Sequence, residues 1–439
     1  MLRRYARRFL RFFAGGGMSL RTGRYFLEAA VVGVLAGLVV VAFHYMIRLG
    51  RDLIFVGLGG CVPWRLAVLP PIGATLGYFL IRRFDSLEHA RGTDSAILAY
   101  HRRHGYVPPA VIPVKSTASV LTVASGGSAG YEGPVTLVGA ACGSLVASWF
   151  GLSRRARRIL MTAGISAGIA ALFQAPLAGA IFGFEILYSS SDVESDPILP
   201  CFIAASISYT IHACFFGWEP LFHMPEGIRY DNALRLFPYF VLAVVVTFGA
   251  RFYISFFRGT ERMFERLRWP GWTKVAVGGV VAGLIGLVMP QVLGTGYPMI
   301  AQCLDPREFP AGLLVAFFFL KAVATSFTVG SGGSGGVFAP AIACGGALGA
   351  AVGIVLERIC PSIGIHPAAF ALVGMAGFLA SCNRIPIAAI VMVSEISGNH
   401  QLLLPAMWVC CISFWLNNGW TLYRSQVRNR DASPVHGMR

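Results

Sequence analysis

The sequence predicts an all-α polytopic membrane protein made of two inverted-topology repeats of tilted, broken helices. Of its 439 residues, 56% are hydrophobic and only 13% are charged, about half the charged share of a soluble domain. The apolar residues form unbroken runs rather than an alternating pattern, which favours helices over a transmembrane barrel. Two glycine-rich turns of nearly the same sequence also lie 206 positions apart.

Residues 1–24 are basic and partly amphipathic, with five arginines between Arg3 and Arg11 at helical spacing. This pattern predicts a helix or tail on the cytoplasmic membrane surface. A signal peptide is the alternative interpretation. The apolar run that follows, from Phe26 to Ile47, is longer than a signal-peptide core and long enough to span a membrane.

Eleven further apolar segments follow, and several are too short to cross a bilayer as straight helices. Prolines at positions 134, 176, 340 and 386 interrupt the pattern. Short, broken helices are tolerated at membrane depth only inside protein or along a wet cavity, so they indicate a solute pathway. The segments are expected at about 66–81, 111–124, 134–150, 159–173, 199–216, 236–257, 274–292, 312–329, 338–356, 367–380 and 402–422.

Polar connectors suggest how the chain is organised. Arg154 to Arg158 is expected to form a basic cytoplasmic loop, and Arg258 to Lys274 a connector between the halves. We predict a first repeat at 25–222, a second at 223–423, a short cytoplasmic tail at 424–439, and no further domain. Both termini are expected to be cytoplasmic, in a multi-pass protein of the cell inner or plasma membrane.

Composition also bounds the partners. The net charge of +16 clusters at the termini and loops, as in cytoplasmic flanks of membrane proteins, and does not indicate nucleic acid. The ten cysteines lack metal-ligand spacing and are interpreted as small buried apolar residues, although a disulfide stays open. No metal or cofactor is expected. The lipid bilayer is the expected environment.

The two halves align as an internal repeat, which we interpret as a duplication. Paired halves with helices broken at matching places are typical of secondary transporters, whose site lies at the repeat interface. Short half-helices meeting at the centre favour an inverted arrangement. At an offset of 206 the pairs are Lys115 with Lys321, Ser125 with Ser331, Gly126 with Gly332, Ser128 with Ser334, Gly130 with Gly336 and Pro134 with Pro340. The pairs farther along are Gly164 with Gly374, Pro176 with Pro386, Ala178 with Ala388 and Glu185 with Glu395.

The repeated turns, Val123–Pro134 and Val329–Pro340, have the chemistry of an anion site. A Gly-Gly-Ser-x-Gly turn that opens a helix leaves backbone N–H groups free at the positive end of the helix dipole. Glycine lets the backbone approach an ion closely, and proline suits the first helical turn. We expect both turns to converge on one anion with no Lys or Arg in the path, because a full positive charge would hinder release.

Glu132 lies within the first turn, where an ionisable side chain costs about 3 kcal/mol on insertion scales. The N–H groups that bind the solute would also stabilise its carboxylate. Glu132 should therefore compete with an anion and leave the site when protonated, which makes it a candidate gate and proton carrier. The alternative is a structural glutamate.

Both turns also match G-x-S-x-G, the nucleophile-elbow pattern, so an intramembrane serine hydrolase is a remote alternative. The pattern is weak in a chain with 52 glycines, and it occurs here once in each repeat. No strand is expected before it. A nucleotide-binding P-loop is disfavoured even more than the hydrolase, because no lysine follows the glycines.

At these residues the chain resembles the CLC family of chloride channels and proton-coupled chloride transporters, in its bacterial type. Gly130-Tyr-Glu-Gly-Pro134 is similar to the family's G-x-E-G-P, which implies that Glu132 is the gating glutamate. Gly336-Val-Phe-Ala-Pro340 is similar to G-[IV]-F-x-P, which implies that Val337 and Phe338 present backbone amides to the anion. Leu422 to Pro434 is similar to the family's last helix, which implies that the Tyr423 hydroxyl donates to the anion.

The resemblance implies a homodimer in which each protomer has its own pathway between two inverted repeats, with Gly130 beside the anion. Many members carry a cytoplasmic pair of nucleotide-binding CBS domains, and none is expected in this chain.

Two positions depart from the family pattern. At the first signature, usually G-S-G-x-P, the chain has Gly92-Thr-Asp-Ser-Ala96, so Thr93 stands at the serine position with Ser95 as the alternative donor. Near residue 185 many proton-coupled members have two glutamates. Here Glu185 matches the first, while Ile186, which cannot carry a proton, occupies the second position. Glu185 is thus a possible inner proton site or a structural residue.

These observations predict chloride transport, extending to other small anions, through a pathway gated by Glu132. The first hypothesis is passive, channel-like conduction. The alternative is exchange of chloride for protons despite Ile186. The protein is not expected to be an enzyme.

Overall fold

The computed structural model describes residues 20–53, 63–84, 92–222, 233–304 and 310–436, and this part of the chain is almost entirely helical. The surface helix expected within residues 1–24 lies mainly outside the described residues. The described part contains sixteen α-helices: α2 (Leu20–Arg51), α3 (Pro63–Arg82), α4 (Thr93–Arg102), α5 (Val111–Ala124), α6 (Glu132–Trp149), α7 (Arg154–Phe173), α8 (Pro176–Glu185), α9 (Ile198–Phe216), α10 (Phe237–Arg266), α11 (Gly271–Val288), α12 (Tyr297–Cys303), α13 (Ala311–Gly330), α14 (Phe338–Ile359), α15 (Pro367–Asn383), α16 (Pro386–Ser397) and α17 (Leu403–Leu416). Four 3-10 helices cover Ala233–Leu236, Pro290–Val292, Pro361–Ile363 and His400–Leu402.

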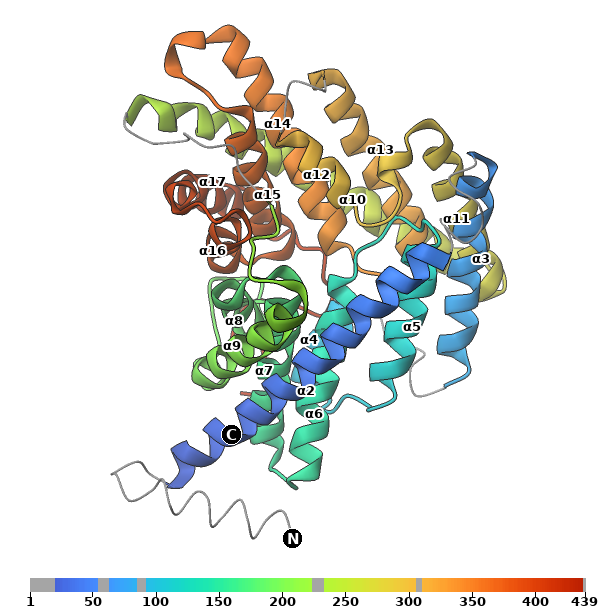
Figure 1. Ribbon diagram of the computed structural model, residues 1–439, viewed down its shortest axis with the longest axis vertical. Coiled ribbons are helices and arrows are strands. Elements are labelled where there is room, and N and C mark those ends of the chain that lie inside the picture. The colour runs from blue at the N-terminus through green and yellow to red at the C-terminus, as the bar shows by residue number, and fades with distance from the viewer. Residues whose placement is uncertain (1–19, 54–62, 85–91, 223–232, 305–309, 437–439) are drawn as a thin grey trace.

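Within the described residues, eight helices are long and apolar enough to cross a membrane: α2, α3, α7, α9, α10, α11, α13 and α14. Figure 1 shows α2 running diagonally across the first half of the chain, where it packs against α5, α6, α7 and α9. Helices α3 and α11, far apart in sequence, lie side by side. The multi-pass, all-α prediction is therefore confirmed.

Four short helices, α4, α8, α12 and α16, were not among the expected segments. The longest of them has 12 residues, which corresponds to about 18 Å at 1.5 Å per residue and is too short to cross a bilayer. A hydropathy window sized for a full span averages such helices with their polar neighbours. Two of them begin with a proline, at Pro176 and Pro386, where the fixed φ of proline suits the first helical turn.

Three expected boundaries were wrong, two of them because charge does not by itself end a helix. The basic segment at Arg154 is the first turn of α7, with Ser153 as its N-cap, and not a loop. Helix α10 continues to Arg266, so the connector expected from Arg258 covers only residues 267–270. The segment expected at 402–422 stops being helical at Leu416.

The two repeats meet at reciprocal hydrogen bonds. The N–H of Gly130 donates to the carbonyl of Gly336 at 2.7 Å, and the N–H of Gly336 donates back at 2.8 Å, in an antiparallel pair. Hydroxyl pairs repeat this relation, with Ser119 beside Ser334 and Ser128 beside Thr325, each at 3.0 Å. Since 119 and 325 are paired positions, as are 128 and 334, the two contacts are related by a local two-fold axis.

Backbone conformation is repeated at paired positions as well. Gly126 and Gly332 have φ of 104° and 110°, in the region that favours glycine. Gln174 and Arg384, which immediately precede the short-helix junctions, have φ of 54° and 62°. Left-handed conformations at non-glycine residues are uncommon, so their recurrence 210 positions apart supports the duplication.

Helices α8 and α16 cap each other across the repeat interface. The Glu185 carboxylate accepts the N–H groups of Ile387 and Ala388 at 2.8 and 2.7 Å, at the start of α16. Glu395 in turn accepts the N–H groups of Leu177 and Ala178 at 3.0 and 2.7 Å, at the start of α8. Each carboxylate satisfies donors that a helix start leaves open and faces the positive end of its dipole.

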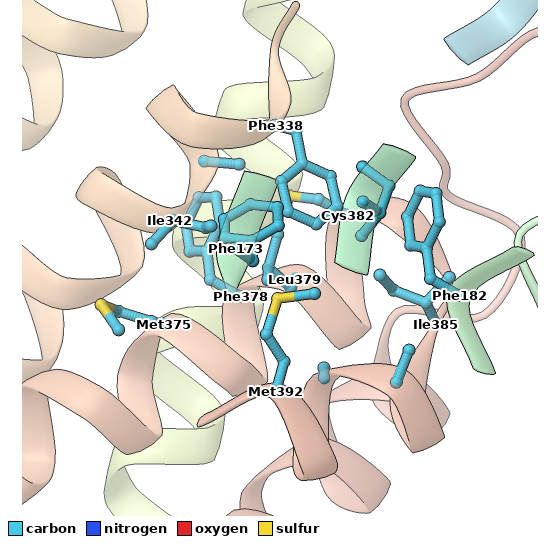
Figure 2. Close-up of a cluster of buried hydrophobic side chains, with 14 of the residues drawn as sticks. Phe173, Phe182, Phe338, Ile342, Met375, Phe378, Leu379, Cys382, Ile385 and Met392 are labelled. Carbon is cyan, nitrogen blue, oxygen red and sulfur yellow. The ribbon is translucent and has the colours of Figure 1, made fainter. Parts of the chain in front are cut away.

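The core lies between the repeats (Figure 2). The Phe338 ring from the second repeat packs against Phe173 and Phe182 of the first, with ring centroids 5.5 and 5.6 Å apart. Residues of α15, including Phe378 and Leu379, continue the same cluster. The nine cysteines within the described residues are free thiols, and most are buried, as expected for small apolar side chains.

Helices α6 and α7 cross at a glycine contact that leaves no space for a side chain. A Cβ on Gly139 would lie 2.2 Å from the carbonyl oxygen of Gly164, and a Cβ on Gly164 would lie 2.1 Å from that of Gly139. Small residues at such crossings let helix backbones approach closely in membranes.

We expect Gly139→Ala to destabilise the protein by about 1–3 kcal/mol, because the added methyl group must push the two backbones apart. Thermal unfolding in detergent measures the effect. The matched control is Gly259→Ala on α10, where an added Cβ would meet nothing within 4 Å and stability should be unchanged or slightly higher. Equal unfolding temperatures for both variants would contradict this account of the crossing.

Candidate functional site

A cavity of 370 Å³ lies beside the paired turns. Its lining includes Gly133 of the first turn, and Gly336 and Val337 of the second. Thr93 and Tyr423 also line it, so both repeats and the C-terminal segment contribute to one cavity. Three of these residues, Thr93, Val337 and Tyr423, are candidate anion-binding residues from the sequence.

Thr93 and Tyr423 bring hydroxyl groups to the cavity. Thr93 is the first residue of α4 and is buried, next to Gly92, whose φ is 73°. The Tyr423 hydroxyl lies near the Thr93 side chain, but it is buried without a regular hydrogen bond to any described residue. A buried donor without a partner costs free energy unless a ligand or water satisfies it. This oxygen therefore suits a bound anion.

The other candidate residues are also located near the paired turns. Val337 is buried, and its carbonyl accepts the Tyr253 hydroxyl at 3.2 Å. Phe338 is the first residue of α14, and its ring is part of the core. Gly130 forms the turn pair itself. Ser95, the alternative donor, does not line the cavity, which leaves Thr93 as the hydroxyl of that segment.

Glu132 lies where the two repeats meet, and its side chain is 1% exposed. Its Oε2 accepts the N–H of Ala339 at 3.2 Å, at the start of α14 in the other repeat. Its Oε1 accepts the hydroxyl of Tyr297. The carboxylate folds back so closely that a Cβ on Gly130 would lie 2.0 Å from it. Glu132 thus occupies a helix N-terminus of the kind that binds anions.

The expectation of a pathway without Lys or Arg was wrong for the cavity. Arg82, Lys115, Lys274 and Arg424 contribute to its lining. Arg424 is paired with Glu261 at 2.6 Å and with Glu265 at 3.1 Å. Lys115 is 3% exposed and has no ion pair or hydrogen bond with any described residue. An unpaired buried ammonium group makes the cavity attractive to anions.

The segment from Leu422 to Pro434 is not the helix that the family resemblance suggested. It consists of turns, and Val427 forms an isolated parallel bridge with Tyr188. Asp94 accepts the N–H and the hydroxyl of Ser425 at 2.8 and 3.0 Å, while the N–H of Leu422 donates to the carbonyl of Cys382 at 2.9 Å. These bonds fix Tyr423 beside the start of α4 without a helix.

Neither Glu185 nor Ile186 offers a free carboxylate. Both oxygens of Glu185 are engaged at the start of α16, and Ile186 is fully buried. The carbonyl of Ile186 accepts the side-chain amide of Gln426 at 2.9 Å. The structure thus presents Glu185 as a helix cap, which is compatible with the structural interpretation.

The hydrolase hypothesis finds no support in the surroundings of Ser128. Its hydroxyl donates to the carbonyl of Val292 at 2.9 Å and lies 3.0 Å from the hydroxyl of Thr325. Neither neighbour can act as a general base, and a nucleophilic serine needs one within hydrogen-bond reach.

Sequence reasoning missed three residues near the site: Asp94, Tyr297 and Lys321. Asp94 and Tyr297 belong to short helices that hydropathy did not detect. Lys321 is fully buried, and its ammonium donates to the carbonyls of Val292 and Gly294 at 2.7 Å each. The alignment of Lys321 with Lys115 indicated the repeat, but nothing in the pattern predicted that the two lysines would have different surroundings.

A family model and two curated relatives match most of the chain. The family model described as "Voltage gated chloride channel" matches residues 72–418. The H(+)/Cl(-) exchange transporter ClcA of Yersinia pestis bv. Antiqua (strain Angola) is 32% identical over 397 residues, covering 88% of this chain and 82% of that protein. ClcA of Salmonella paratyphi B is also 32% identical, covering 88% of this chain and 83% of the relative.

Solved structures share the fold. A CLC-type fluoride/proton antiporter superposes with a TM-score of 0.81 at 22% identity, covering 94% of this chain and 99% of that one. A slow cyanobacterial Cl-/H+ antiporter has a TM-score of 0.78 at 22% identity, covering 90% of this chain and 94% of its own.

We expect Tyr423→Phe to weaken binding of a small anion about fivefold, since one neutral hydrogen bond contributes about 1 kcal/mol. Stability should change little, because the hydroxyl makes no regular bond within the described protein. Isothermal titration with chloride measures the affinity. Tyr239→Phe, on α10 with its ring stacked on Phe370 at 4.3 Å, is the matched control. Unchanged chloride affinity in Tyr423→Phe would rule out the hydroxyl as a ligand.

Proposed function

The chain belongs to the voltage gated chloride channel family, and from this membership we propose that it carries chloride across a membrane in exchange for protons. Anion transport is the shared activity of the family. Exchange is the more specific proposal, and it replaces passive conduction as the main hypothesis because the 32% identical relatives are H(+)/Cl(-) exchange transporters.

The observation that carries the proposal is the position of Glu132. A buried carboxylate that accepts an N–H at the start of α14 occupies a place where an anion would be equally stabilised. Because the carboxylate and chloride have the same charge and need the same donors, they exclude each other. Protonation removes the charge that holds Glu132, so the side chain can leave while a chloride enters.

In the proposed cycle, chloride enters the cavity, where Lys115 supplies uncompensated positive charge. The hydroxyls of Thr93 and Tyr423 and the backbone near Val337 then replace part of its hydration shell. Glu132 takes up a proton and moves aside, so chloride passes the paired turns. When Glu132 returns as a carboxylate it releases the proton, and each cycle couples a proton to anion movement.

The inner proton step needs another explanation. With Ile186 fully buried and Glu185 engaged as a helix cap, neither offers a free carboxylate between Glu132 and the cytoplasm. Water in the 370 Å³ cavity is the route we propose. Passive, channel-like conduction remains the second candidate, and Ile186 is the observation that favours it. Other small anions are proposed substrates alongside chloride.

We further propose a homodimer. Large apolar side chains are exposed on α8, α9, α16 and α17, including Leu177, Leu199, Ile387 and Trp408. Helix α8 contacts α9 and α16, and α16 contacts α17, so these side chains belong to neighbouring elements. We also propose cytoplasmic termini and a boundary between the repeats near residue 222.

Reconstitution in liposomes tests the proposal. With a chloride gradient imposed, chloride efflux and the pH outside the vesicles are recorded together. Uphill proton movement driven by chloride is the expected result. Chloride efflux without proton movement would favour the passive hypothesis, and absence of any anion flux would reject both.

We expect Glu132→Ala to abolish proton movement while chloride efflux continues, because the variant removes the titrating carboxylate but leaves the donors at the start of α14 in place. The same liposome assay measures both fluxes. A variant that still pumps protons would exclude Glu132 as the proton carrier, and one that passes no anion would exclude it as the gate.

Glu185→Gln and Glu395→Gln form a matched pair that tests the inner site. Each substitution weakens one cap, so we expect similar losses of stability, about 1 kcal/mol each, in thermal unfolding. Proton coupling should persist in both variants if both residues are only caps. Selective loss of proton movement in Glu185→Gln would instead assign Glu185 to the proton pathway.

A further inference from the structure

Tyr297, in the second repeat, forms a hydrogen bond to the carboxylate of Glu132 in the first repeat. It is the first residue of α12, and its hydroxyl donates to Oε1 of Glu132. The other carboxylate oxygen accepts the N–H of Ala339. Glu132 is therefore held at both oxygens, once by a backbone group and once by a side chain. A hydrogen bond to an ionised group is about twice as strong as one between neutral groups.

The position of Tyr297 is set by a loop that is bonded on both sides. The carbonyl of Gly294 accepts the Lys321 ammonium at 2.7 Å and the N–H of Ala129 at 3.1 Å. The carbonyl of Val292 accepts Lys321 at 2.7 Å and the Ser128 hydroxyl at 2.9 Å. The first repeat's turn and α13 thus fix the loop three residues before Tyr297. The Tyr297 ring also packs edge-to-face on Phe222, with ring centroids 6.1 Å apart.

The internal repeat relates Tyr297 to Thr93. Both residues begin a short helix, and both follow a glycine with positive φ, 89° at Gly296 and 73° at Gly92. The two positions are 204 residues apart. Each repeat therefore presents a hydroxyl at the start of its short helix. The hydroxyl of Thr93 serves the cavity, whereas that of Tyr297 reaches the carboxylate.

We propose that Tyr297 is a positioning residue that keeps Glu132 in the closed position and so limits the rate of transport. This inference rests on the proposed function. The hydroxyl stabilises the ionised carboxylate in place, and its contribution is lost when Glu132 takes up a proton and leaves. Tyr297 thus sets how acidic the medium must be before the pathway opens.

The ionisable groups around Glu132 come from four elements. They are Tyr297 on α12, Lys321 on α13, Tyr131 in the turn before α6, and Tyr423 of the C-terminal segment. Among the described residues, the Tyr297 hydroxyl makes the only side-chain hydrogen bond to the Glu132 carboxylate. The Lys321 ammonium instead donates hydrogen bonds to the two loop carbonyls.

The test is the pH profile of chloride efflux from liposomes containing Tyr297→Phe. We expect the midpoint to move by about one pH unit toward higher pH, with about tenfold faster efflux above the wild-type midpoint, as one charge-assisted bond is lost. The ring and its contact with Phe222 are retained, so folding should be preserved. Tyr239→Phe is the control and should keep the wild-type profile.

A double-mutant cycle separates positioning from a general structural effect. In a Glu132→Ala background the hydroxyl has no carboxylate to hold, so adding Tyr297→Phe should change efflux by less than about twofold. A wild-type pH profile for Tyr297→Phe, or an equal effect in both backgrounds, would overturn the inference. If Tyr297→Phe does not fold, Tyr297→Leu provides a second test with the same expected shift.

The failure of this inference is distinguishable from failure of the proposed function. If the wild-type protein moves no chloride, the proposed function is wrong. If the wild-type protein transports and Tyr297→Phe is indistinguishable from it, only the positioning role is wrong.

Discussion

The reciprocal hydrogen bonds between Gly130 and Gly336 are the contact on which the rest of the site depends. They bring two helix N-termini from different repeats to the same place, at α6 and α14. Neither turn tolerates a side chain there, because a Cβ on Gly336 would lie 2.7 Å from the nitrogen of Gly133. This close approach lets the N–H of Ala339, at the positive end of the α14 dipole, reach Glu132 across the interface.

The proposed transport function depends on the positions at which the two repeats differ. The turns, the hydroxyl pairs and the reciprocal caps of α8 and α16 follow the symmetry closely. Glu132 has Phe338 as its counterpart, so one repeat supplies a carboxylate and the other a ring in the core. Thr93 has Tyr297 as its counterpart, so a short hydroxyl-bearing side chain in one repeat corresponds to a long one in the other. A strictly symmetric pathway would have no directional gate, and we propose that these differences provide one.

The two buried lysines show how the same residue acquires different tasks. The Lys321 ammonium donates hydrogen bonds to two backbone carbonyls and so fixes the loop before α12. Lys115, at the paired position, has no such partner among the described residues and lines the cavity. Burial of a charged group is costly unless it is paired, so Lys321 has a structural explanation. The unpaired charge of Lys115 is instead available to a solute anion.

The sequence alone determined the membrane class, the duplication, the two turns and Glu132, because these features are local in the chain or recur in it. It could not locate α4, α8, α12 and α16, whose short lengths fall below what hydropathy resolves and which are stable only through burial against other helices. The partners of Glu132, Glu185 and Tyr423 also required the tertiary structure. Each of them bonds or faces groups from distant segments, and such pairings depend on how the two repeats dock rather than on local pattern.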